Sequence, residues 1–154
     1  MFDEIDLKLL RKIADSGRIT WSDLAGHLGL SAPATAERVR RLEDRGVIRG
    51  YAARFDPEAL GCPLLALVAV TLEKPSHRAG FLHWVGHTPE VMECHHVAGD
   101  DDYLVKLRCA GTQALERLLS EGIKGLPGVV RTRTTIVLST VKETVVPPLP
   151  KEAR

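Results

Sequence analysis

The chain has 154 residues, of which 44% are hydrophobic and 27% charged, and its formal net charge at pH 7 is +1. This composition is typical of a globular protein with one ordinary domain or two small ones. The small net charge excludes a histone-like coat of positive charge, so nucleic-acid binding would require a local basic patch that oligomerisation duplicates.

Cysteine and hydropathy patterns exclude further classes. The three cysteines form no CxxC pair, which predicts neither a disulfide framework nor a zinc finger and fits a reducing cytoplasm. Acidic residues follow Phe2 where a secretory signal would be basic, so we expect no such signal. The longest apolar run, residues 64–72, is too short to span a bilayer, so we expect no membrane partner.

The first 48 residues predict three helices that pack as a trihelical unit. In residues 3–16, apolar side chains recur at i, i+4 and i+8, which indicates an amphipathic helix. Thr20 and Ser31 are N-cap residues of two further helices, and Gly29 supplies the left-handed turn between them. This is the pattern of a helix-turn-helix, whose second helix enters the major groove of DNA, although proteins that do not bind DNA also contain such hairpins.

The second of these helices, residues 31–44, predicts a polar outer face next to a local basic patch. The patch contains six arginines, Arg38, Arg40, Arg41, Arg45, Arg49 and Arg54. Phosphate binding requires a patch of this kind. We expect the DNA-binding residues to be Ser31, Pro33, Ala36, Glu37, Arg38, Arg40 and Arg41. Two of them have alternatives, since Arg38 can form an internal ion pair and Glu37 can restrain Arg41 at i+4.

Residues 49–63 predict a linker between two domains. The chain is extended from Val47 to Phe55, and Asp56-Pro57 then forces a turn. We expect the first half of the linker to be strand-like and able to pair with another strand or another subunit.

From residue 64 onward, strands and helices alternate. We expect strands at 64–72, 91–98, 103–109 and 129–141, one helix at 77–86 with Phe81, Leu82 and Val85 facing inward, and a second helix beginning at Thr112. The order β-α-β-β-α-β is the ferredoxin-like arrangement. It predicts an α+β fold with a domain at 64–144 and an irregular tail at 145–154. Because helices cover one face of such a sheet, we expect the other face to dimerise.

Cys94, His95 and His96 beside three aspartates raise the question of a metal site. Adjacent strand residues point to opposite faces, so His95 and His96 cannot both bind one ion without distortion. Contiguous aspartates also differ from the alternate spacing of a calcium loop. We therefore expect no metal site.

Three segments resemble a single family in their order and spacing. They are LAGHLGLS…ERVRRLEDRGVIRGY (24–51), ECHHVAGDDDYLVK (93–106) and LPGVVRTRTTIVL (126–138). Through them the chain resembles the leucine-responsive/asparagine-regulatory (Lrp/AsnC) transcription factors of bacteria and archaea. The resemblance implies an N-terminal winged helix-turn-helix, residues 1–48, followed by a βαββαβ ferredoxin-like effector-binding domain. It also implies dimers formed through the sheets, often assembled into tetramers or octamers.

The resemblance further implies that a small molecule, usually an amino acid, binds between dimers. Carried onto this sequence, the effector-binding residues are Gly99, Asp100, Asp101, Asp102, Tyr103, Thr134 and Thr135. Carboxylate and hydroxyl groups suit the ammonium and carboxylate of an amino acid. Family members commonly carry an aromatic or other uncharged residue in place of Asp101. Three consecutive aspartates predict a preference for basic amino acids, whereas the alternative is a solvated turn that caps backbone N–H groups.

The sequence thus predicts a cytoplasmic, nucleoid-associated transcriptional regulator that binds double-stranded DNA and responds to an amino-acid-like effector. A nucleoid-organising protein without an effector is one alternative. A sirohaem-decarboxylase-like enzyme is another, although the acidic turn would repel a polycarboxylate substrate. No Ser/His/Asp order, glycine-rich phosphate loop or paired acid/base spacing stands out, so we expect neither catalytic residues nor a cofactor.

Overall fold

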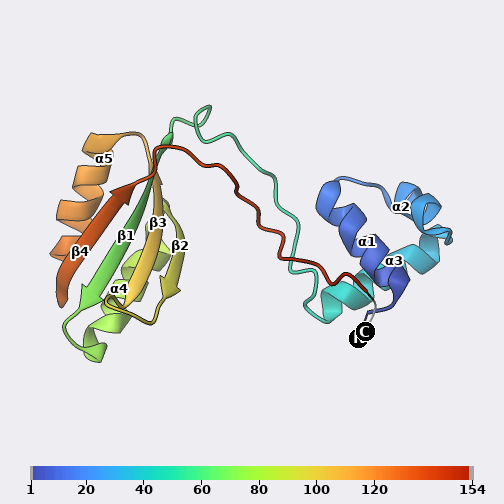
Figure 1. Ribbon diagram of the computed structural model, residues 1–154, viewed down its shortest axis with the longest axis horizontal. Coiled ribbons are helices and arrows are strands. Elements are labelled where there is room, and N and C mark those ends of the chain that lie inside the picture. Colours follow the sequence, from blue (N-terminus) through green and yellow to red (C-terminus); the bar gives the residue numbers. More distant parts are fainter. Residues whose placement is uncertain (1, 153–154) are drawn as a thin grey trace. The chain divides into compact units, whose positions relative to one another are not determined.

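The computed structural model describes residues 2–152, which form two compact units (Figure 1). Residues up to 54, together with the tail from residue 142, form the first unit, here called the head. Residues 55–141 form the second unit, here called the sheet domain. The C-terminal tail therefore packs with the N-terminal helices, although the chain reaches it only after the last strand.

The head consists of three helices around a small leucine-rich core. They are α1 (Glu4–Asp15), α2 (Trp21–Leu28) and α3 (Ala32–Asp44). Their buried side chains are Leu9, Leu10, Leu24, Val39 and Leu42. Gly29 ends α2 in the left-handed conformation, with φ of 66°. The predicted trihelical unit and the glycine turn are therefore confirmed.

Side-chain caps fix where the helices of the head begin. Thr20 accepts a hydrogen bond from the backbone N–H of Asp23 (3.1 Å) and donates its hydroxyl to the Asp23 carboxylate (2.7 Å). A reciprocal capping box occurs at α1, where Asp3 and Asp6 each accept from the other's backbone N–H. These caps satisfy N–H groups that lack partners within the helix.

After α3 the chain forms no strand within residues 45–63, all of which the structure describes, and residues 57–61 form the turn expected after Asp56-Pro57. A strand requires a partner along its edge, and this single chain offers none there. Tyr51 anchors the start of the segment by donating its hydroxyl to Glu43 Oε1 (2.9 Å). Burial and the adjacent Glu43 carboxylate raise the pKa of Tyr51 to about 12.

The sheet domain contains four antiparallel strands in the order β2-β3-β1-β4. The strands are β1 (Leu64–Leu72), β2 (Val91–His96), β3 (Tyr103–Cys109) and β4 (Val129–Ile136). A short 3₁₀ turn (Pro75–His77) leads into α4 (Arg78–His87), and α5 (Thr112–Arg117) continues as a π turn (Leu118–Gly122) and a 3₁₀ turn (Ile123–Gly125). The α+β fold and the ferredoxin-like order are confirmed (Figure 1).

Three local predictions in this domain were wrong. The first concerns β2, which ends at His96 rather than at residue 98. The last strand ends at Ile136, not at residue 141, because β1 begins at Leu64 and supplies no partner beyond the bond from Val137 N–H to the Leu65 carbonyl (2.9 Å). Leu82 on α4 is exposed, and Trp84 packs against the core in its place. Phe81 and Trp84 are three residues apart and so share a helix face.

The two faces of the sheet differ in their cover. Both helices contribute to the core on one face, where Phe81, Leu115 and Ile123 pack on alternate strand residues such as Val68 and Val105. The opposite face, here called the open face, carries the residues between them. Its apolar members are Leu65, Leu67, Ala69 and Leu104. Within residues 2–152, no helix is long and apolar enough to cross a membrane.

Candidate nucleic-acid interface and effector site

The inner and outer faces of α3 are clearly separated. Thr35, Val39 and Leu42 are buried against the other helices, as the 3.6-residue period predicts. Ser31 uses its hydroxyl as the N-cap acceptor for Ala34 N–H (3.3 Å). The side chains left exposed on the outer face are those of Pro33, Glu37, Arg40 and Arg41, with Ala36 half-buried beside them. Small residues near the N-terminus of α3 would allow close approach to a groove.

Arg38 differs from the other predicted DNA-binding arginines because it binds the first helix of the head. Its guanidinium forms ion pairs with Asp3 (2.7 Å) and Asp6 (2.8 Å) at the N-terminus of α1, and its side chain is only 21% exposed. The pKa of Asp3 is lowered by the backbone N–H of Asp6 and by Arg38. The geometry thus favours the internal ion pair, the alternative that the sequence left open for this residue.

Arg40 and Arg41 present their charges on the exposed side of α3. Arg40 contacts Glu37 one turn earlier (2.6 Å), and both side chains are more than half exposed. An exposed pair of this kind contributes about 0–1 kcal/mol, so it does not prevent Arg40 from moving to another acceptor. The hydrogen bond of Glu37 is thus with Arg40, at i+3, and not with Arg41, the partner expected at i+4.

The acidic turn after β2 is held by side chains of β1 and β4. Asp101 is buried and contacts Arg131 (3.1 Å) and Arg133 (2.9 Å) on β4, and it also accepts from the Thr71 hydroxyl (2.9 Å). The carbonyl of Asp100 accepts a further bond from Arg131 (2.7 Å). The two arginines thus contact Asp100 and Asp101, the first two of the three aspartates.

The next residues of the turn also have structural partners. Asp102 accepts from Leu72 N–H through its side chain (2.7 Å), and its own N–H donates to the Val70 carbonyl (2.9 Å). Tyr103 is buried in the core, in contact with Phe81 and His96. Its hydroxyl has no hydrogen-bond partner among the described residues. The turn is therefore ordered by its own backbone and carboxylates, as in the alternative reading of a capped turn.

The predicted effector residues do not all share one side of the sheet. Thr134 pairs with Val68 and so faces the helices, whereas Thr135 pairs with Leu67 and faces the open side. Sequence reasoning missed Arg131 and Arg133, which share the open side with Thr135. The signal was present in VVRTRTTI, since residues two apart in a strand lie on one face.

The charge of this region differs from the prediction. The sequence suggested a strongly negative turn that would favour basic amino acids, but Arg131 and Arg133 offset much of that charge. Both guanidinium groups are more than half exposed and remain accessible to an additional anion. The predicted preference for basic amino acids therefore loses its electrostatic basis.

We expect Asp101→Asn to lower the melting temperature of the sheet domain by a few degrees at pH 7. Its bond from Thr71 and its two arginines lower the pKa of Asp101, so the folded state favours the carboxylate. This stabilisation is complete well above the unfolded pKa of about 3.9 and is lost as the pH falls through the lower folded pKa. In thermal melts from pH 7 to pH 3, the melting temperatures of wild type and Asp101→Asn should therefore become equal below about pH 4.

Asp100→Asn is the matched control, because the side chain of Asp100 is exposed. It should leave the melting temperature almost unchanged throughout that pH range. A difference between wild type and Asp101→Asn that persists undiminished at pH 3 would show that the carboxylate charge is not the cause.

The histidines near the turn lie on opposite faces, as predicted. His95 contacts Glu93 on the open face (3.1 Å), whereas His96 stacks on Tyr103 at the helix-covered face. Lys106 also donates to Glu93 (2.9 Å), and with His95 it lowers the pKa of that carboxyl. Among the described residues, no three His, Cys, Asp or Glu side chains gather as a metal site.

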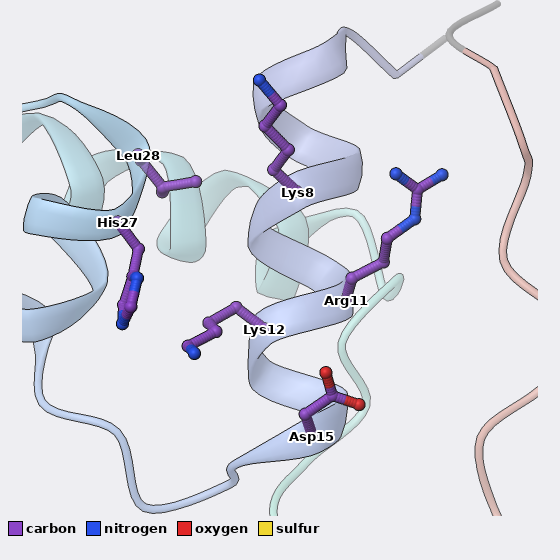
Figure 2. A pocket seen from close by; sticks show the side chains of 6 residues that line it. All are labelled: Lys8, Arg11, Lys12, Asp15, His27 and Leu28. Carbon is purple, nitrogen blue, oxygen red and sulfur yellow. The ribbon is translucent and has the colours of Figure 1, made fainter.

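A small basic pocket lies between α1 and α2 of the head (Figure 2). Its volume is about 260 Å³, and its lining residues are Lys8, Arg11, Lys12, Asp15, His27 and Leu28. Lys12 and His27 point into the space between the helices, while Arg11 points away from α2 toward the tail. The pocket is smaller than most small-molecule sites, and it adds a second basic surface to the head.

Two family models match separate parts of the chain. A winged helix-turn-helix DNA-binding model matches residues 2–49, and an Lrp/AsnC ligand binding domain model matches residues 65–147. The chain is 46% identical over 138 residues to the HTH-type transcriptional regulator LrpA of Mycobacterium tuberculosis, covering 90% of this chain and 91% of that protein. It is 43% identical over 144 residues to the leucine-responsive regulatory protein of Haemophilus influenzae, with coverage of 92% and 87%.

Solved structures also match along nearly the whole chain. A transcriptional regulator from Neisseria meningitidis in complex with L-methionine has a TM-score of 0.92 at 29% identity, covering 96% of this chain and 97% of that one. A feast or famine regulatory protein from M. tuberculosis, complexed with L-methionine, has a TM-score of 0.86 at 44% identity, covering 95% and 98%.

Proposed function

This chain belongs to the Lrp/AsnC family of transcriptional regulators, and from that premise we propose that it binds duplex DNA sequence-specifically and responds to a small amino-acid-like effector. The observation that carries the proposal is the separation of α3 into a buried inner face and an outer face that exposes Arg40 and Arg41. A helix with short residues at its start and arginines farther along suits the major groove.

The proposed DNA contacts divide by role. Arg40 and Arg41 read or hold the DNA, with Pro33, Ala36 and Glu37 at the surface beside them. Ser31 and Arg38 act within the head, since one caps α3 and the other ties α3 to α1. The basic pocket between α1 and α2 adds charge that would favour phosphate binding.

We place the proposed effector site where the acidic turn meets β4 on the open face. An amino acid would direct its carboxylate toward Arg131 and Arg133 and its ammonium toward the exposed side chain of Asp100. Relatives of similar fold are solved with L-methionine, which supports an uncharged amino acid as the first ligand to test. An effector regulates only if it binds two assemblies or head arrangements with different affinity.

Binding of a labelled duplex, selected from a random pool, tests both parts of this proposal. We expect anisotropy titrations to show binding that weakens steeply with salt and that changes when one amino acid from a panel of twenty is added. A coupling of about 1–3 kcal/mol, or five- to 150-fold in affinity, is the usual size of such an effect. No preference over random DNA would contradict sequence-specific regulation and favour a nucleoid-organising role.

We also propose that the chain dimerises through its open face, where Leu65, Leu67 and Ala69 form an apolar strip along β1. Leu67→Ala should then raise the dimer dissociation constant about tenfold, since truncating one interface residue costs about 1.4 kcal/mol. Light scattering over a dilution series measures this change. Leu138→Ala is the control, because Leu138 is 97% exposed and lies outside the sheet. A monomer at micromolar concentration would contradict the proposal.

Further parts of the proposal concern organisation and setting. We propose a DNA-binding domain at 1–48, a linker at 49–63 and an effector-binding domain at 64–144, in a cytoplasmic protein that associates with the nucleoid. Tetramers or octamers would bring several heads onto one DNA and raise their effective concentration. Relatives of this chain are transcriptional regulators, which supports a regulatory rather than an enzymatic role.

A further inference from the structure

The C-terminal tail makes specific contacts with the head that neither the proposed DNA contacts nor the effector site requires. One terminal nitrogen of Arg11 on α1 donates to two successive carbonyls, those of Pro150 (2.9 Å) and Lys151 (3.1 Å). Leu149 packs against the leucine core of the head. In Figure 1 the end of the tail lies beside the helices of the head.

Exposure along the tail shows that docking is local. Leu138 and Val141 are 97% and 98% exposed and Val145 is 90% exposed, whereas Leu149 is half-buried. Between these residues exposure falls to 37% at Val146, so burial of the tail begins just before Leu149. Only the last contacts combine an apolar anchor with a cation that binds backbone carbonyls.

Prolines prepare this segment for docking. Pro147, Pro148 and Pro150 fix their own φ near −65° and favour an extended polyproline-type conformation. An extended segment has little conformational freedom left to lose on binding. It also exposes its carbonyls, because its backbone makes no internal hydrogen bonds. A guanidinium that donates to two neighbouring carbonyls suits such a ligand.

We propose that α1 carries a docking site for an extended proline-rich segment and that the chain's own tail, residues 147–151, occupies it. Arg11 and the apolar surface beneath Leu149 form the site. Each head is then joined to its sheet domain twice, once through the linker 49–63 and once through residues 137–146, which continue from β4 to the docked segment. Because β4 carries Arg131 and Arg133, which contact Asp101, the docked tail connects the strand beside the acidic turn to the head. This inference does not depend on DNA binding.

Native lysines allow a direct test on the full-length protein. Lys8 and Lys12 flank Arg11 on α1, and Lys151 supplies one of the docked carbonyls. A short amine-reactive cross-linker, read by mass spectrometry, should join Lys151 to Lys8 or Lys12. Mixing unlabelled protein with ¹⁵N-labelled protein then separates cross-links within one chain from those between two copies. We expect pairs within one chain.

Two independent variants test the contacts themselves. Arg11→Met removes the donor and Leu149→Ser removes the apolar anchor, and each should lower the yield of these cross-links several-fold. Arg18→Met is the control for loss of an exposed arginine in the head, and it should leave the yield unchanged. Circular dichroism verifies that each variant is folded. The proposal would be overturned if Lys151 formed no cross-links to α1, or if neither variant changed their yield. It would also be overturned if the cross-linked pairs joined labelled to unlabelled chains.

Discussion

Leu42→Ala is expected to lower the free energy of unfolding of the head by about 2–5 kcal/mol while leaving the sheet domain intact. Leu42 is 1% exposed and packs with the other buried leucines of the head. The sheet domain buries a separate set of side chains around Val68 and Phe81. Truncating Leu42 therefore removes buried apolar contacts and leaves a cavity in one core only. Hydrogen exchange read by mass spectrometry should show faster exchange in α1–α3 and unchanged exchange in β1–β4.

Two further variants complete this experiment. Leu107→Ala, at a fully buried position on β3, should produce the opposite pattern, with faster exchange in the sheet domain. Leu60→Ala is the surface control, because Leu60 is 63% exposed, and it should change the stability by less than about 0.5 kcal/mol. Equal loss of protection in both units after Leu42→Ala would show that they unfold as one cooperative unit.

The architecture of the head could be predicted from sequence because its signals are local. An N-cap such as Ser31 and a left-handed residue such as Gly29 act within a few residues of their own positions. The period of apolar residues then decides which face is buried. Local patterns likewise predicted the order of strands and helices along the second domain, although the end of the last strand depended on how far β1 extends to meet it.

The side-chain partners of the charged residues could not be predicted in the same way. Arg38 and Asp3 are 35 residues apart, and Asp101 and Arg133 are 32 apart. An arginine on a helix looks the same in the sequence whether it faces DNA or a carboxylate on a neighbouring helix. The acidic turn posed the same problem, since its net charge depends on which strand lies beside it.

The candidate effector site shows how strand register decides what a pair of residues does. Thr134 and Thr135 are neighbours in the sequence, yet they face opposite sides of the sheet. A residue that shares a face with Thr135 is two positions away, at Arg133. Recognition of the alternation in β4 would have placed the arginines at the site, whereas the family resemblance alone suggested the threonines.

Arg40→Ala is expected to weaken binding to the selected duplex by about tenfold to a hundredfold and to affect random DNA much less. A good bidentate contact from arginine to guanine contributes about 1–3 kcal/mol of discrimination, and Arg40 is 68% exposed on the outer face of α3. Its contact with Glu37 is also exposed and is too weak to oppose this exchange of partners. Anisotropy titrations with competitor DNA measure both affinities.

Variants of two other arginines separate this effect from general loss of charge. Arg117→Ala removes an exposed arginine from α5 of the sheet domain and should leave both affinities unchanged. Arg38→Ala breaks the ion pairs to Asp3 and Asp6. It should therefore lower the melting temperature of the head and weaken binding to selected and random DNA equally. Equal weakening of selected and random DNA by Arg40→Ala would instead assign Arg40 to a phosphate, because phosphate contacts carry no sequence information. Unchanged affinity for both DNAs would remove Arg40 from the interface.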